Sequence, residues 1–463
     1  MGSIQWAVAF ALSVSLSPST SAHAKTARSY SENKAVNGLT VLTVPMNKVP
    51  LVTIVLVAKA GAMTESPDTN GLTHVWEHMF FKGNQTLPNQ EAFNRRVRQL
   101  GISFNGDTSA EMVRYYFTLP SQNLSEGLRF MADAIATPLL EPAELERERK
   151  VVLDEYDRNA SQPFFELNVI ERHLIYGDQE YLRNPLGRRR LIENTTREQL
   201  LKIKDEVFVP ANSALIVSGD VDSKTLMPLV NQHFASWKTP ENWKPRLQSI
   251  SNKLASTSSV TKTHPSTQNV TMQITWKGPT VKADPEDTWA IDTLIQLIEH
   301  RSGKFYAKLI DSGLTLGAGF GYQTQAQAGE VVLYAMTTAE NAKNARKILA
   351  DEPREWLKPG YFSAGQLEDV KRRVMISKKM ELNKPSEYGK TMAFWWAVTG
   401  LGYYDNYLTA MSRVTLSDVT KVIKKYLIGK PHVEIILLSP KASETAGLPD
   451  NSAPHVAKFL KGY

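Results

Sequence analysis

The sequence predicts an α+β protein built from two related domains, and three observations lead to this fold class. At 463 residues, the chain is longer than a single hydrophobic core usually supports. A stretch rich in Pro, Ser, Thr, Lys and Asn interrupts it near the middle. The segment after this stretch repeats the order of strands and helices that precedes it. We therefore expect an internal duplication of about two hundred residues per copy.

The first residues have the pattern of an export signal. An apolar stretch from Ile4 to Leu16 is followed by a Ser/Pro-rich segment and by Ala22-His23-Ala24, which has the small-x-small form of a signal-peptidase site. No arginine occurs here, unlike in a mitochondrial transit peptide. An uncleaved anchor is the alternative, but the apolar run is shorter than the roughly 20 residues that cross a bilayer. We predict a signal peptide over 1–24, cleaved near Ala24, and a periplasmic or secreted protein without stable membrane insertion.

Strands begin the predicted N-terminal domain, which we place at residues 25–240. Residues 39–44 and 51–57 are rich in β-branched residues and are bounded by Pro and Asn. The second strand leads through two glycines into a helix that carries His74-Val75-Trp76-Glu77-His78. The apolar spacing that follows predicts helices over 91–100, 126–136 and 142–159, and strands over 112–119 and 214–220.

The second half, placed at residues 265–463 after a linker at 241–264, is predicted to restart this order. Its elements are strands over 269–276, 330–337 and 433–438 and helices over 288–300 and 365–381. The metal motif is absent from this copy. Glu299-His300 has Leu297 and Gln296 where an upstream ligand would be needed, which favours an ordinary surface histidine.

The composition excludes several kinds of site. The chain has no cysteine, so disulfides, thiolate ligands and cysteine nucleophiles are absent. The net charge of +7 is mild, and the cations alternate with acids, as in residues 146–150. This pattern is typical of a solvated helix face, so we expect no nucleic-acid partner. A basic lining that attracts acidic peptides or nucleic acid is the alternative.

The HxxEH sequence at residues 74–78 predicts a metal site. Residues four apart lie one turn above each other on a helix, so the imidazoles of His74 and His78 can converge on one ion. Glu77 lies at the edge of the same face, where its carboxylate can take a proton from water that zinc activates. With nine histidines in the chain, we expect this spacing by chance on the order of one time in a hundred.

A catalytic zinc site normally has three protein ligands, so one ligand lies outside the motif. The acidic helix over residues 144–157 is the expected donor. Glu148 and Glu155 are seven apart and face the same way, but the spacing leaves open Glu144, Glu146, Glu148, Asp154 and Glu155.

The stretch from Gly71 to Gly83 closely resembles the signature of the pitrilysin or insulinase-type zinc peptidases, in particular the HxxEH-bearing subunits of their short processing-peptidase branch. Further matching segments are 104–108 followed by Tyr115, 148–155, 184–187, and 209–212 leading to 219–220. The resemblance therefore covers nearly the whole chain after the signal. It implies one Zn²⁺ per chain, with Glu155, 77 positions after His78 (155 − 78), as the third ligand and Glu148 as a supporting residue.

The resemblance also implies the architecture and the mode of substrate binding. Each domain would be an antiparallel sheet with helices packed on one face, and the two domains would form half of a four-domain clamshell. An extended peptide would add to a sheet edge near the metal. Asn105 and Tyr115 are the implied substrate contacts. The alternatives are a turn-stabilising role for Asn105 and a core position for Tyr115.

One segment departs from the family pattern. Complete enzymes carry an Arg and a Tyr in a segment similar to residues 309–316, and neither residue is present here. Because these donors stabilise the developing oxyanion, we predict a heterodimer with a homologous subunit that supplies them. A self-sufficient homodimer that uses Tyr322 is the alternative.

The sequence thus predicts a zinc metalloendopeptidase subunit that hydrolyses extended or short polypeptides. Two other kinds of protein remain as alternatives. One is a non-catalytic core or assembly subunit of the same fold, which would lack stoichiometric zinc. The other is a peptide-binding module with a structural zinc, which would have a fourth protein ligand.

Overall fold

The computed structural model of the chain describes residues 29–251, 253–381 and 383–460. The predicted signal peptide, residues 1–24, lies outside these ranges and stays a prediction. Within the described ranges, no helix has both the length and the apolar character needed to cross a membrane.

The first half of the chain forms a six-stranded sheet. Its strands lie in the order β1 (Ser31–Lys34), β2 (Thr40–Pro45), β6 (Ser213–Gly219), β3 (Leu51–Ala58), β5 (Val113–Pro120) and β4 (Ser103–Thr108). Only β2 and β6 run parallel, and the other pairs are antiparallel. The strand β4 is therefore an edge strand, paired on one side with β5.

The second half forms a five-stranded sheet that repeats this topology. Its order is β7 (Ser258–Thr263), β11 (His432–Leu438), β8 (Val270–Gly278), β10 (Gly329–Thr337) and β9 (Gly317–Gln323). Here only β7 and β11, the first and last strands of this half along the chain, run parallel. The order matches β2–β6–β3–β5–β4 strand for strand, which confirms the predicted α+β fold with two homologous domains. The predicted linker at 241–264 contains β7, so its last part belongs to the second sheet.

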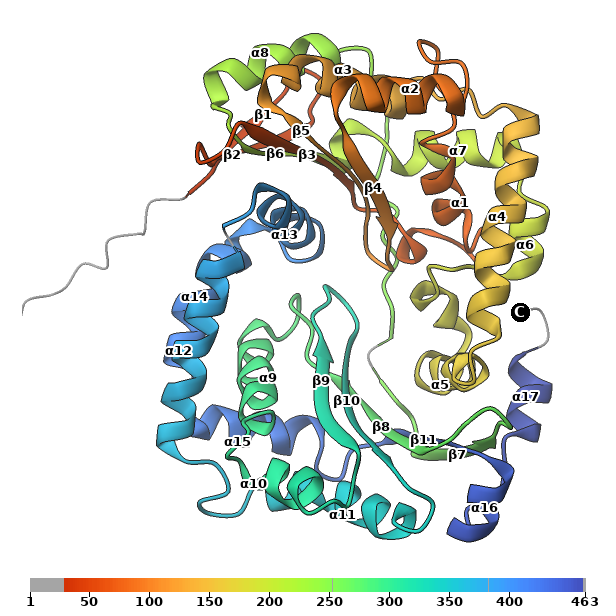
Figure 1. Ribbon diagram of the computed structural model, residues 1–463, viewed down its shortest axis with the longest axis vertical. Coiled ribbons are helices and arrows are strands. Elements are labelled where there is room, and N and C mark those ends of the chain that lie inside the picture. The colour runs from red at the N-terminus through yellow and green to blue at the C-terminus, as the bar shows by residue number, and fades with distance from the viewer. Residues whose placement is uncertain (1–28, 252, 382, 461–463) are drawn as a thin grey trace, which may run out of the picture.

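Helices of each half cover one face of its own sheet (Figure 1). In the first half these are α1 (Leu72–Met79), α2 (Gln90–Leu100), α3 (Leu124–Ala136), α4 (Pro142–Ala160), α6 (Arg189–Glu193), α7 (Arg197–Val207) and α8 (Ser223–His233). In the second half they are α9 (Pro285–Ile298), α10 (Lys304–Tyr306), α11 (Ala342–Glu355), α15 (Leu416–Tyr426) and α16 (Pro440–Ala446). The helices α12 (Ala364–Glu381) and α14 (Leu401–Arg413) pack on α9 and on each other at the side of this layer. Each layer encloses an apolar core, with Ile54 and Phe117 in the first and Ile274 and Leu333 in the second.

The opposite face of each sheet is covered by a helix from the other half. The helix α13 (Pro385–Val398) packs on β3 and β6, where Met392 and Ala393 meet Val55 and Ile216. Gly389 permits this approach, because a Cβ there would lie 2.8 Å from Ser218 Oγ. In return, α5 (Phe165–Tyr176) packs on β11 and β7, and α17 (Ala453–Phe459) packs on α5. The resemblance predicted helices on one face only, so this exchange is an addition to the predicted architecture.

Short turns complete the chain. They are the 3₁₀ turns η1 (Ala62–Thr64), η2 (Ser121–Asn123), η3 (Gly177–Arg183) and η4 (Pro210–Asn212), and the π-helical turn η5 (Ala307–Asp311).

Candidate metal centre

The helix α1, which carries the HxxEH sequence, begins on a buried carboxylate. Its first residue is preceded by Gly71, which has a φ of 101° and no side chain to accept from the free N–H groups of the first turn. The carboxylate of Glu65 caps the helix in place of an N-cap side chain. It accepts from Gly71 N at 2.9 Å, Thr73 N at 2.8 Å and Thr73 Oγ1 at 2.7 Å. Glu65 is completely buried, and it fixes where the helix starts.

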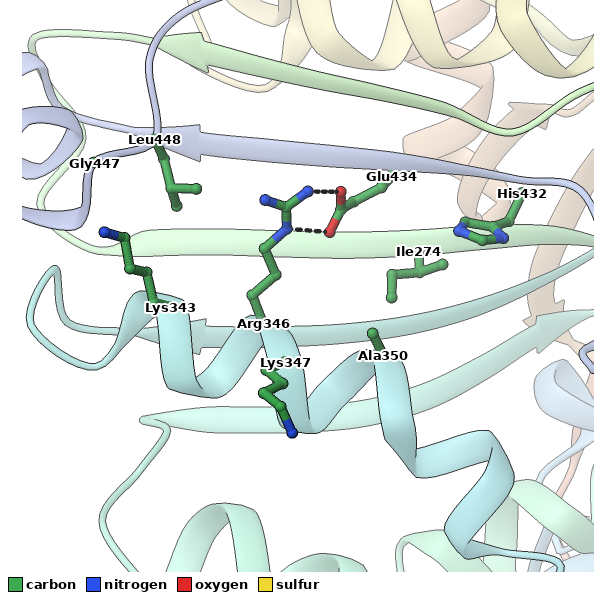
Figure 2. Close-up of a pocket in the computed structure, with 9 residues that line it drawn as sticks. All are labelled: Ile274, Lys343, Arg346, Lys347, Ala350, His432, Glu434, Gly447 and Leu448. Carbon is green, nitrogen blue, oxygen red and sulfur yellow. Dashed lines mark hydrogen bonds and ion pairs between the residues drawn. The ribbon is translucent and has the colours of Figure 1, made fainter.

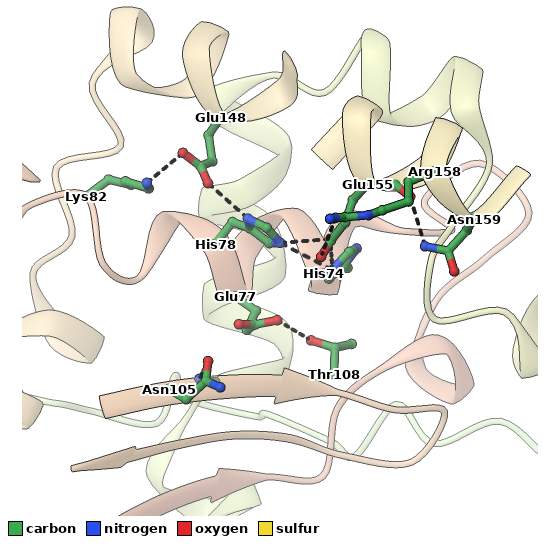
Figure 3. Close-up of polar contacts among 11 residues, drawn as sticks. His74, Glu77, His78, Lys82, Asn105, Thr108, Glu148, Glu155, Arg158 and Asn159 are labelled. Atoms are coloured by element: carbon green, nitrogen blue, oxygen red, sulfur yellow. Dashed lines mark hydrogen bonds and ion pairs between the residues drawn. The ribbon is translucent and has the colours of Figure 1, made fainter. Parts of the chain in front are cut away.

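The buried face of α1 orients the polar residues of the motif. Val75, Trp76 and Met79 are buried in the first core, and the Trp76 ring stacks on Phe208 at 5.2 Å. The 3.6-residue period then turns His74 and His78 toward α4 and places Glu77 above β4, as Figure 3 shows.

Three side-chain atoms from α1 and α4 form a nearly equilateral triangle. The Nε2 atoms of His74 and His78 are 3.3 Å apart, and Glu155 Oε2 lies 3.4 Å from the first and 3.5 Å from the second. In a tetrahedral zinc site with bonds of about 2.0–2.1 Å, neighbouring ligand atoms are about 3.3–3.4 Å apart. These residues therefore fit Zn²⁺ with one position left for another ligand.

The hydrogen bonds behind the triangle support the same arrangement. His78 Nδ1 donates to Glu148 Oε1 at 2.9 Å, so its Nε2 can present a lone pair to a metal. Burial lowers the pKa of His78, but the hydrogen bond to Glu148 and the neighbouring carboxylates leave this pKa above its ordinary value. The hydrogen bond with His74 lowers the pKa of Glu155, which keeps it a carboxylate. Among the described residues, the buried His74 Nδ1 has no hydrogen-bond partner.

Glu77 lies close to the two imidazoles but outside the triangle. The potential ligand atoms of His74, Glu77 and His78 lie within 4.8 Å of one another, a looser group than the one that Glu155 completes. The distances therefore favour Glu155 over Glu77 as a partner of the two imidazoles at a metal site. Glu77 Oε2 accepts from Thr108 Oγ1 at 3.3 Å. Burial raises the pKa of Glu77, although His74 and His78 oppose the change, and a raised pKa suits a proton acceptor.

The other acidic residues of α4 do not join the triangle. Glu144 pairs with Arg147 and Glu146 with Lys150, in both cases within the helix, and Asp154 is exposed. Of the five acids that the spacing left open, only Glu148 and Glu155 contact the histidines.

The two predicted substrate contacts lie in different surroundings. Asn105 is exposed on the edge strand β4, and its Oδ1 accepts from Gly106 N at 2.9 Å, as in the turn-stabilising alternative. Tyr115 is only 1% exposed and its ring stacks on Phe80 at 3.8 Å. The structure therefore does not place Tyr115 where it could touch a peptide, which corrects its prediction as a substrate contact.

Residues 309–316, the segment that lacks the Arg and the Tyr, end just before β9, an edge strand of the second sheet. Leu309 is buried, and Leu316, next to β9, is 55% exposed. Tyr322 packs against the helix-covered core of the second half, and its hydroxyl donates to Pro279 O at 3.0 Å. This placement does not favour Tyr322 as the missing donor.

A separate depression in the second half, of about 480 Å³, lies between α11 and the sheet (Figure 2). At its floor, Arg346 Nε and Nη2 donate to the two oxygens of Glu434 at 2.8 and 2.5 Å, and Ser259 Oγ donates at 2.7 Å. Both oxygens of the Glu434 carboxylate are thus engaged, and within the described ranges the side chains grouped closely enough to hold a metal ion are those of the motif at residues 74–78.

Two family models match the chain. Residues 40–186 match the insulinase domain of peptidase family M16, and residues 194–374 match the domain described as the peptidase M16 inactive domain. The chain belongs to the insulinase family of peptidases. A zinc protease of Helicobacter pylori, PqqE, is 26% identical over 399 residues, which are 84% of this chain and 88% of that protein. The mitochondrial-processing peptidase subunit beta of Lentinula edodes is 29% identical over 44% of each chain.

Solved structures of two bacterial proteases share the fold. A protease from Helicobacter pylori superposes with a TM-score of 0.80 at 21% identity, covering 89% of this chain and 99% of that one. The first half of the periplasmic protease PqqL from Escherichia coli gives a TM-score of 0.73 at 18% identity, covering 94% and 96%. Against the whole PqqL protease, this chain spans half the length.

Sequence reasoning missed three polar residues that shape the site. They are Glu65, which caps α1, Lys82, which contacts Glu148, and Thr108, which contacts Glu77. Lys82 and Thr108 lie inside segments that match the family signature, so the resemblance was the available signal for them. For Glu65, the signal was an acid shortly before a helix whose cap is a glycine.

Proposed function

We propose that this chain is the metal-bearing subunit of a zinc endopeptidase that cleaves extended or short polypeptides. His74, His78 and Glu155 would bind one Zn²⁺, and Glu77 would act as the general base. The observation that carries the proposal is the triangle of 3.3, 3.4 and 3.5 Å between the three ligand atoms. Membership of a family with named zinc proteases supports it.

The chain's own residues supply the proton transfers. When bound, zinc provides Lewis acidity and lowers the pKa of water toward about 7. Glu77, buried and held by Thr108, accepts the proton of the attacking water and then donates it to the leaving amine. Burial raises the pKa of Glu77, which makes its carboxylate a stronger base and favours the first transfer.

The edge strand β4 offers a place for the peptide backbone. Its inner neighbour β5 takes one row of its hydrogen bonds, and the outer row faces away from the sheet. A peptide that adds there as a further strand would lie beside Glu77, because a Cβ on Gly106 would come within 2.5 Å of Glu77 Oε1. Asn105 is the residue of this edge that we assign to a substrate contact.

We further propose that a homologous subunit completes the active site. The segment 309–316 contains no Arg or Tyr to stabilise an oxyanion, and Tyr322 is engaged elsewhere. The processing-peptidase relative is itself named as a subunit, and PqqL is titled a periplasmic protease. Together with the predicted signal peptide, these relatives support a periplasmic heterodimer.

The test is metal analysis and peptide hydrolysis on the chain purified from its native source, with and without the protein that co-purifies. Glu77→Gln should keep its zinc and lose about 10²–10⁴-fold in hydrolysis of a fluorogenic peptide, because only the proton acceptor is removed. Glu146→Gln, an exposed acid on α4, should behave as the wild type. Absence of stoichiometric zinc would reject the peptidase assignment, and full activity of the isolated chain would reject the heterodimer.

A further inference from the structure

Lys82 lies just beyond the end of α1, in the turn that leads to Gly83. Its Nζ is 2.7 Å from Glu148 Oε2, on the side of the carboxylate away from His78 (Figure 3). Only 13% of the Lys82 side chain and 6% of the Glu148 side chain are exposed. The ammonium is therefore largely withdrawn from water to meet one carboxylate, which is costly unless the contact has a structural or functional use.

The same carboxylate holds a predicted metal ligand. Glu148 Oε1 accepts from His78 Nδ1 at 2.9 Å, so Lys82, Glu148 and His78 form one continuous chain of charge-assisted hydrogen bonds. His74 has no such support, because its Nδ1 finds no partner within the part of the chain that the structure describes. Of the two imidazoles, only that of His78 is therefore oriented by a hydrogen bond with a described residue behind the ring.

We propose that Lys82 is a positioning residue of the metal centre, acting on His78 through Glu148. The inference rests on the proposed function. Lys82 makes Glu148 point one oxygen at His78, and Glu148 sets the ring plane and tautomer of His78. Lys82 itself touches neither the metal position nor the substrate edge.

Two opposite effects make the outcome informative. A cation near a metal centre repels Zn²⁺, so a lysine that acted only through its charge would weaken zinc binding, and its removal would tighten binding. A lysine that positions Glu148 has the opposite effect, because its removal frees the carboxylate and loosens His78. The sign of the change in zinc affinity therefore separates the two roles.

The experiment measures the zinc dissociation constant of the full chain by competition with a chromophoric chelator. We expect Lys82→Met to weaken zinc binding by about 10–100-fold, the usual cost of losing an outer partner of a ligand, and Lys82→Arg to restore most of it. Glu148→Gln should cost a similar factor. In the Glu148→Gln background, Lys82→Met should add less than about twofold, because the two residues act in series.

A matched control comes from the second half. Lys308 Nζ lies 2.7 Å from Glu352, which is completely buried, so Lys308→Met breaks an equivalent pair far from the motif. It should leave zinc affinity unchanged, and circular dichroism should confirm the fold of every variant. If Lys82→Met fails to fold, Lys82→Gln compared with Lys82→Arg gives the same test.

Several results would overturn the inference. These are unchanged or tighter zinc binding in Lys82→Met, losses that multiply in the double variant, or an equal loss in Lys308→Met. A wild-type chain that binds no zinc would instead reject the proposed function, so the two failures are distinguishable.

Discussion

Glu155 and Asp154 are neighbours on α4, but only Glu155 reaches the two imidazoles. Glu155→Gln should therefore weaken zinc binding by more than the 10–100-fold typical of an outer partner, because a charged ligand is lost. Asp154→Asn removes the adjacent exposed charge and should leave zinc content unchanged. Metal analysis after dialysis against a weak chelator checks both. Equal zinc loss in the two variants would mean that the charge of α4, and not the ligand, retains the metal.

The residues of the motif could be predicted from their local spacing, but the contacts around the motif could not. Four-residue spacing on a helix places His74 and His78 together, because the period of a helix is known in advance. The third ligand required either the family resemblance or the structure, since five acids on α4 shared the right region. The contact of Lys82 with Glu148 joins residues 66 positions apart (148 − 82), and no local pattern encodes such a pairing.

At the scale of elements, the start of α1 depends on a close contact between two glycines. Gly187 has a φ of +85°, and a Cβ there would lie 2.4 Å from the Cα of Gly71, the N-cap of α1. Gly187→Ala should lower the free energy of unfolding by the cost of a left-handed alanine, about 1–2 kcal/mol, plus about 1–3 kcal/mol for overpacking. It should also weaken zinc binding, because α1 must shift.

Gly101→Ala is the control for this effect. Gly101 also has a positive φ, 65°, but its added Cβ would meet only Pro120 side-chain atoms at 3.6 Å or more. Gly101→Ala should lower the free energy of unfolding only by the cost of a left-handed alanine, and it should keep the zinc affinity of the wild type. Urea unfolding and chelator competition measure the two quantities. If both variants lose stability equally and keep zinc, the contact between Gly71 and Gly187 does not position the helix.

Long elements with clear periodicity were predicted to within a few residues. The strand expected at 51–57 is β3, Leu51–Ala58, and the helix expected at 142–159 is α4, Pro142–Ala160. The edge strands β4 and β9 were harder to predict. The sequence of β4 contains Asn105, Gly106 and Asp107, and β9 contains three glycines, so neither has the β-branched composition that marks a strand. Only the family resemblance pointed to β4.

At the scale of the whole molecule, a buried acid lies between the two halves. Glu171 on α5 accepts from Thr275 Oγ1 at 2.5 Å and from Gln273 Nε2 at 2.9 Å, both on β8. Burial raises the pKa of Glu171 to about 7, against the hydrogen bond from Thr275, and the charge of Glu330 adds to the increase. The folded protein therefore binds a proton here that the unfolded chain releases near its ordinary pKa of 4.5.

This difference predicts a loss of stability with rising pH. The folded pKa lies above the unfolded one, so the stabilisation is complete below about pH 4.5 and is lost as the pH rises to about 7, by on the order of 3 kcal/mol. Glu171→Gln should remove this part of the pH dependence. Urea unfolding at pH 5 and pH 8 measures it, with Glu241→Gln, an exposed acid, as the control. Identical pH dependence in Glu171→Gln and wild type would contradict the prediction.

Duplication of the domains could be predicted from the repeated order of elements, but the exchange of α5 and α13 could not. Both helices contact a sheet that is distant in the chain, and the apolar residues that they bury would equally suit a helix packed on its own domain. Which partner an apolar face finds depends on the three-dimensional path of the chain and not on the local pattern.

The exchange also constrains the order in which the protein can form during synthesis. All strands of the first sheet are complete by Gly219, whereas α13 begins only at Pro385. Until those later residues emerge, the surface around Val55 and Ile216 has no helix to cover it. Nascent chains of intermediate length should therefore display an apolar face that attracts chaperones or other nascent chains, and the first half matures only when nearly the whole protein has been made.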